Sequence, residues 1–69
     1  MVENNQNEEM LIAQVKPQKI VDHFEGDISE IKSWADMSTK EELIISIKAF
    51  QREGMNQYID TLLESLNKK

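Results

Sequence analysis

Two apolar stripes at helical spacing, separated by a single glycine, are the strongest structural signal in this sequence of 69 residues. The first stripe contains Leu43, Ile47 and Phe50. The second stripe, which follows Gly54, contains Met55, Tyr58, Ile59, Leu62, Leu63 and Leu66. Residues three and four apart share one face of a helix, so the spacing predicts amphipathic helices over about 39–53 and 55–67. A short link that contains glycine lets two such helices pack antiparallel.

Two capping signatures predict where helices begin. Asp27 is followed three residues later by Glu30, and Ser38 is followed by Glu41. An Asp or Ser at the N-cap accepts a hydrogen bond from a backbone N–H group of the first helical turn. We therefore expect one helix from Asp27 to about residue 36, where apolar residues again recur at helical spacing. The second signature marks the start of the 39–53 helix.

The first 24 residues carry weaker signals. Residues 1–9 are mostly Asn, Gln and Glu, and we predict that they form a disordered polar leader. The apolar run 10–15 is too short to distinguish a buried strand from a helical turn. Pro17 limits this run, because the residue before a proline avoids helical geometry. Pro17 also suits the first position of a short helix through Phe24, which Gly26 then ends.

These signals together predict an all-α fold of three or four short helices around the C-terminal hairpin. A chain of this length forms one domain, which we place at residues 10–69. No segment approaches the roughly 18 to 20 apolar residues that a membrane span requires. The first residues also lack the basic and apolar parts of a secretory signal, so we expect a cytoplasmic protein.

The sequence contains no cysteine and only one histidine, His23. Disulfides, thiolate metal sites and zinc sites with several histidines are therefore excluded. Small domains bury too little apolar surface to be more than marginally stable, and most of them need a covalent, metal or protein partner. We therefore expect a second copy of the chain, or another protein, to cover part of the apolar surface.

No catalytic centre is expected from the sequence. A nucleophile needs a base to activate it, and His23 has no cysteine to pair with. The nearby carboxylates Asp22, Glu25 and Asp27 are typical of a solvated, acidic helix end, and a hard-metal or acid–base cluster is the less favoured alternative. The two glycines are isolated, so no phosphate-binding loop is present. We expect no enzyme activity, no cofactor and no bound metal.

The net charge of −5 comes from residues 1–38, which contain eight acids and three lysines, whereas residues 39–69 are neutral. This balance disfavours binding to nucleic acid or to anionic membranes, because both depend on clustered Lys and Arg. The alternative that stays open is a dimeric DNA-binding transcription regulator. The hairpin would then act as a helix-turn-helix with Lys48 and Arg52 on phosphates, or residues 10–15 would supply the strand of a ribbon-helix-helix.

Binding to a protein fits the sequence best. Ile45 lies on the opposite side of its helix from the first stripe, so it needs cover from the N-terminal segments or from another chain. Aromatic residues and Met are enriched in protein interfaces, although a single Trp in a small domain is often a core residue. The candidate contact residues, for a partner or for self-association, are Ile45, Trp34, Met37, Tyr58 and Met55.

The segment 38–66, with its capping signature, its two stripes and its glycine turn, resembles the helical hairpins of several small bacterial regulators that bind a kinase or a repressor. The likeness covers less than half of the chain and concerns the type of module, not membership of a family. It implies a function of the same kind. We predict a small, non-enzymatic regulatory protein that acts by stoichiometric binding, as an inhibitor, an adaptor, an assembly factor or a phage-type accessory protein.

Overall fold

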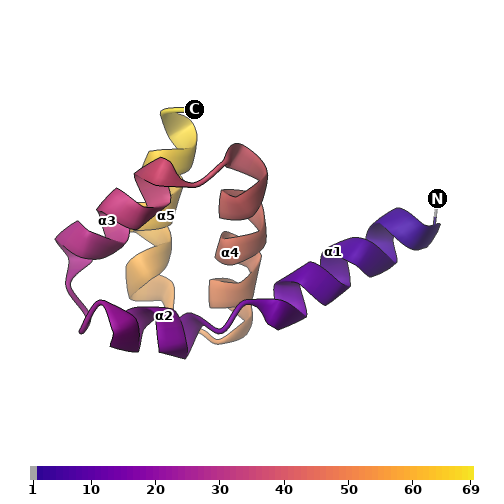
Figure 1. The fold of residues 1–69 in the computed structure, drawn as a ribbon, viewed down its shortest axis with the longest axis horizontal. Helices are drawn as coiled ribbons and strands as arrows, with labels where there is room; N and C mark the ends of the chain where they lie inside the picture. Colours follow the sequence, from indigo (N-terminus) through magenta and orange to yellow (C-terminus); the bar gives the residue numbers. More distant parts are fainter. Residues whose placement is uncertain (1) are drawn as a thin grey trace.

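The computed structural model describes residues 2–69, with side chains from Glu8 onward. Within this range the chain forms five helices and no strand. They are α1 (Val2–Gln14), α2 (Pro17–His23), α3 (Ile28–Met37), α4 (Lys40–Arg52) and α5 (Asn56–Asn67). α2 to α5 form the body of the molecule, and α1 extends away from it (Figure 1). The prediction of an all-α fold is confirmed.

The extra helix, beyond the three or four predicted, comes from the N-terminal part of the chain. Residues 10–14, whose pattern did not distinguish strand from helix, belong to α1. The helix ends before Lys16, whose backbone (φ −117°, ψ 88°) is not helical, as expected of a residue that precedes a proline. The predicted disordered leader, residues 1–9, overlaps α1. Met1 and the side chains up to Asn7 lie outside the described residues, so the disorder stays a prediction.

The core forms where α5 packs against both α3 and α4 (Figure 1). The whole apolar stripe of α4 packs into the core, since Leu43 and Phe50 are completely buried and Ile47 is nearly so. Leu62 is the most buried residue that α5 contributes to this core, whereas Leu63 is 40% exposed. The complete buried cluster is Val21, Ile31, Ala35, Leu43, Ile47, Phe50, Tyr58, Ile59 and Leu62.

The caps follow the predicted chemistry, with a shift of one residue at α4. The Asp27 carboxylate accepts hydrogen bonds from the backbone N–H groups of Ser29 (2.9 Å) and Glu30 (3.4 Å), as expected of an N-cap. At α4 the capping pair is Thr39 and Glu42 instead of the predicted Ser38 and Glu41. The Glu42 N–H donates to the Thr39 hydroxyl (3.1 Å), and the Thr39 N–H donates to the Glu42 carboxylate (2.9 Å).

Ser38 has a different role, at the end of α3. Its hydroxyl donates a hydrogen bond to the backbone carbonyl of Trp34 at 3.0 Å. Ser38 is the C-cap residue of α3, and its backbone is extended. The link between α3 and α4 consists of Ser38 and Thr39 only. This short link keeps Trp34 close to the first turn of α4.

α2 and α4 end with the same pair of backbone hydrogen bonds, with one left-handed residue after α4 and two, Glu25 and Gly26 (φ +73°), after α2. At α4, the Met55 N–H donates to the carbonyl of Phe50 (3.0 Å) and the Gly54 N–H to that of Gln51 (3.1 Å). This is a Schellman motif, and its left-handed position holds Gly54 (φ +70°). At α2, the Gly26 N–H donates to the carbonyl of Val21, and the left-handed position holds Glu25 (φ +54°). The predicted terminator, Gly26, is one residue further on.

We expect Glu25→Gly to stabilise the protein. The left-handed region costs a residue with a Cβ about 1–2 kcal/mol of conformational free energy, and glycine avoids this cost. Glycine also has greater freedom in the unfolded chain, which offsets part of the gain in stability. The net gain should be about 0.5–1 kcal/mol in the free energy of unfolding, measured by urea denaturation. Gly54→Ala, the matched change in the opposite direction, should lower it by about 1 kcal/mol. Equal stability of the Glu25→Gly variant and the parent would show that Glu25 is not strained.

Candidate protein-binding groove

A groove of about 370 Å³ lies where α1 and the end of α3 meet the first half of α4. Its apolar walls come from three separate parts of the chain. Leu11 and Val15 belong to α1 and the residues after it, Trp34 belongs to α3, and Ile45 belongs to α4. The remaining lining residues are Gln14, Ser38, Glu41, Glu42 and Ser46.

The groove continues towards α2 as a second hollow of about 470 Å³. The two hollows share Gln14, Val15, Trp34 and Ser46, so we treat them as one continuous feature and call it the Trp34 groove. The second hollow adds the side chains Lys16, Lys19, Ile20, His23 and Phe24. A third hollow of about 420 Å³ lies beside the α1–α2 link and shares Val15, Lys16 and Lys19 with the second hollow. Arg52 and Glu53 border it on the α4 side, and it does not include Trp34.

Trp34 occupies the middle of this groove and is only partly buried. The centre of its ring lies 6.3 Å from that of Phe24, at an interplanar angle of 45°. Phe24 in turn contacts the ring of His23 edge-to-face, with 4.8 Å between their centres. Such aromatic contacts restrict the rings, so the centre of the groove is a pre-positioned apolar surface with part of Trp34 open to solvent.

The two ends of the Trp34 groove carry opposite charge. Glu41 and Glu42 line the end next to the first turn of α4, and no Lys or Arg lines that hollow. Lys16 and Lys19 line the other end, together with His23, and no Asp or Glu lines that hollow. The Lys16 ammonium group donates a hydrogen bond to the carbonyl of Ala13 at 3.1 Å, which holds it near the end of α1.

α1 forms one wall of the groove and is held against α4 by few contacts. Among its described side chains, only Ile12 is buried, at 5% exposure. Glu8 pairs with Lys48 at 2.9 Å, and Glu9 pairs with Arg52. Exposed ion pairs each contribute at most about 1 kcal/mol, so the burial of Ile12 is the main interaction that holds α1 in place.

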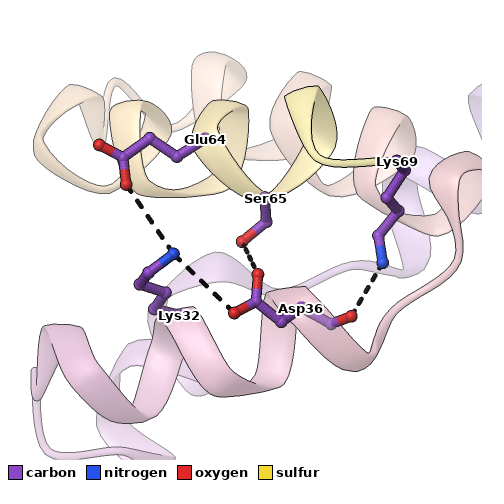
Figure 2. A network of polar contacts seen from close by, with 5 residues as sticks. All are labelled: Lys32, Asp36, Glu64, Ser65 and Lys69. Carbon is purple, nitrogen blue, oxygen red and sulfur yellow. Dashed lines mark hydrogen bonds and ion pairs between the residues drawn. The ribbon is translucent and has the colours of Figure 1, made fainter.

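A polar network on the other side of the core joins α3 to α5 (Figure 2). The buried Ser65 hydroxyl donates to the Asp36 carboxylate at 2.6 Å, and the Lys69 ammonium donates to the Asp36 carbonyl at 2.8 Å. Lys32 lies 3.8 Å from Asp36 and 3.9 Å from Glu64, which is an ion-pair distance. The Ser65 hydrogen bond, helped by the nearby lysines, lowers the pKa of Asp36. This network therefore fixes α3, and with it Trp34, on α5.

The structure brings together two of the five predicted contact residues. Ile45 and Trp34 both line the groove. Met37 is 87% exposed but does not line it. Tyr58 is a core residue whose ring contacts Phe50 edge-to-face at 6.2 Å, and Met55 is partly buried against the same core. The sequence interpretation did not name Leu11 and Val15 as contact residues, although their apolar run was the available signal.

None of the carboxylates considered for a metal ion, and neither of the two candidate phosphate contacts, lines the groove. Asp22, Glu25 and Asp27 are exposed, and among the residues with described side chains no three Asp, Glu or His form a cluster suited to a metal ion. Lys48 and Arg52, the candidate phosphate contacts, are paired with Glu8 and Glu9. Residues 10–14 are helical, so the ribbon-helix-helix arrangement lacks its strand.

No protein-family model, no curated protein and no solved structure matches this chain. In the described part of the chain, no helix combines the length and the apolar character needed to cross a membrane.

Proposed function

We propose that this chain is a small, non-enzymatic regulatory protein of the cytoplasm that acts by stoichiometric binding of another protein in the Trp34 groove. The observation that carries the proposal is the meeting of Trp34 and Ile45 in one open, largely apolar groove. Both were selected from the sequence as interface residues, and both keep surface that the rest of the chain does not cover.

The composition of the groove favours a protein segment as its occupant. An aromatic ring surrounded by branched aliphatic side chains, with charged residues at the ends, has the pattern of an interface centre and its polar rim. The groove runs past α1, α2, α3 and α4, so an extended or helical segment can contact it along its length. An inhibitor, an adaptor or an assembly factor would each use such a surface.

The proposal is tested with substitutions inside and outside the groove. We expect Ile45→Asp to reduce partner binding at least about tenfold, because a carboxylate would be desolvated in the apolar centre of the interface. Leu11→Asp should act in the same way, and Leu11 is already 49% exposed, so the change leaves the fold intact. Leu63→Asp, on α5 and outside the groove, is the matched control with 40% exposure.

The measurement is capture by the tagged full chain from a lysate of its source cell, followed by quantitative mass spectrometry. One protein should be recovered in equimolar amount with the parent and with Leu63→Asp, and lost with both groove variants. Recovery that is the same for all four chains would contradict the proposal, and so would the absence of any protein in equimolar amount. Circular dichroism of each variant confirms that the helices are retained.

A further inference from the structure

We propose that the Trp34 groove also pairs with the same groove of a second copy of this chain, in a two-fold symmetric dimer with antiparallel grooves. The inference rests on the proposed function, because it names one occupant of the surface used there. It goes further by fixing the orientation of that occupant and the residues that meet across the interface.

The opposite charges at the two ends of the groove favour this pairing. Glu41 and Glu42 form an acidic end, Lys16 and Lys19 form a basic end, and Trp34 lies in the shared middle. A surface with this order of charges is complementary to itself when it is reversed. Opposite charges that face each other across an interface favour one orientation and disfavour the others.

Two-fold symmetry makes this complementarity apply twice. With a two-fold axis that crosses the groove near Trp34 at right angles to its length, the acidic end of each copy faces the basic end of the other. An axis that runs along the groove would instead place Glu41 and Glu42 opposite the same residues of the partner. Like charges in contact cost free energy, so the antiparallel arrangement is the favoured one.

The exposed apolar surface of α1 also favours pairing with a second copy. Leu11 lines the groove and is 49% exposed, and the preceding residue, Met10, is 60% exposed. α1 also extends away from the body of the molecule (Figure 1), so it can reach a second copy. A helix that presents apolar side chains fits an apolar groove, and in the dimer each α1 wall packs into the groove of the other copy.

The expected dimer is a weak one. A standard interface buries about 800 Å² on each partner. The whole chain has a surface of 4875 Å², and the groove occupies one face of it. Area alone does not set affinity, and the two ends of this interface are formed by exposed charges, which contribute little each. We therefore expect a dissociation constant in the micromolar range.

The first measurement is the solution mass of the full chain by sedimentation equilibrium, from about 5 to about 500 µM, a range that spans a micromolar dissociation constant. The mass should rise from the 8.0 kDa of one chain towards twice that value. A mass that stays at 8.0 kDa throughout would overturn the pairing. The capture experiment would still decide the proposed function, because it measures a different partner.

The second measurement uses two charge-reversed chains. Lys16→Glu/Lys19→Glu makes both ends acidic, and Glu41→Lys weakens the acidic end, so each variant alone should dimerise at least about tenfold more weakly than the parent. Mixed in equal amounts, the two should form a heterodimer that is tighter than either variant alone and weaker than the parental dimer. The unaltered acidic end of one chain then meets the unaltered basic end of the other, and the two altered ends, one acidic and one neutral, do not repel each other. Glu42 is left unchanged because it caps α4.

Controls change the charge outside the groove, Asp60→Lys by the same amount as Glu41→Lys and Lys40→Glu by half as much as the double lysine variant. Lys40→Glu and Asp60→Lys alter exposed residues that do not line it, and both should dimerise like the parent. Restored association in the mixture would establish the antiparallel pairing. Dimerisation that both groove variants retain, or a mixture that fails to recover it, would overturn the pairing even if the parent chain is dimeric.

Discussion

Leu62→Ala should lower the free energy of unfolding by about 3–4 kcal/mol, the loss expected when a fully buried leucine leaves a cavity. Leu62 is completely buried in the cluster where α3, α4 and α5 meet. A domain of this size has a total stability of about 3–10 kcal/mol, so the variant would lose a large part of it. Urea denaturation followed by circular dichroism gives the value directly.

The next residue in the sequence provides the control for this prediction. Leu63 is 40% exposed, and Leu63→Ala should cost less than about 1 kcal/mol. The two variants have the same chemical change on the same helix, so any difference between them reports burial alone. Similar losses at the two positions would mean that α5 packs with a different face towards the core.

Ile12→Ala should release α1 and leave the rest of the molecule folded. Removing this side chain costs about 2–3 kcal/mol, because Ile12 is the buried residue among the described side chains of α1. α1 packs mainly against α4, so the loss falls on the docking of α1. Native-state hydrogen exchange should show protection of the amides at 11–14 reduced about 30- to 150-fold, with little change at 43–50.

Met10→Ala is the control on the same helix. Met10 is 60% exposed, and its truncation should change the protection of the α1 amides by less than about threefold. If Ile12→Ala lowered the protection of α1 and α4 equally, α1 would be an integral part of the cooperative core. The view of α1 as a separately docked helix would then be wrong.

The hairpin was predictable because its signal is local. Leu43, Ile47 and Phe50 recur at helical spacing, and all three are buried in the structure. The exact cap of α4 was not predictable, since the sequence from Ser38 to Glu42 contains two overlapping capping patterns. Thr39 takes the cap because Ser38 bonds back to Trp34 and ends α3. Two helices compete for adjacent residues here, and a pattern read for one helix at a time does not resolve that competition.

The groove was only half predictable, for a different reason. The sequence pointed to Ile45 because it lies on the opposite side of its helix from the apolar stripe, and to Trp34 because aromatic residues are enriched in protein interfaces. Their meeting with Leu11 depends on how α1 crosses α4, which no local spacing encodes. The same holds for Asp36 and Ser65, which are 29 residues apart in the chain and meet through the packing of α3 on α5.

Because α1 supplies one wall, the proposed binding site is complete only in those molecules in which α1 is docked. The apparent affinity of the groove is then its intrinsic affinity multiplied by the docked fraction. A change far from Trp34 that reduces this fraction tenfold would weaken binding tenfold without altering any contact with the ligand. Conversely, a ligand that touches Leu11 stabilises α1 as it binds, so occupancy of the groove and order of the N-terminal helix rise and fall together.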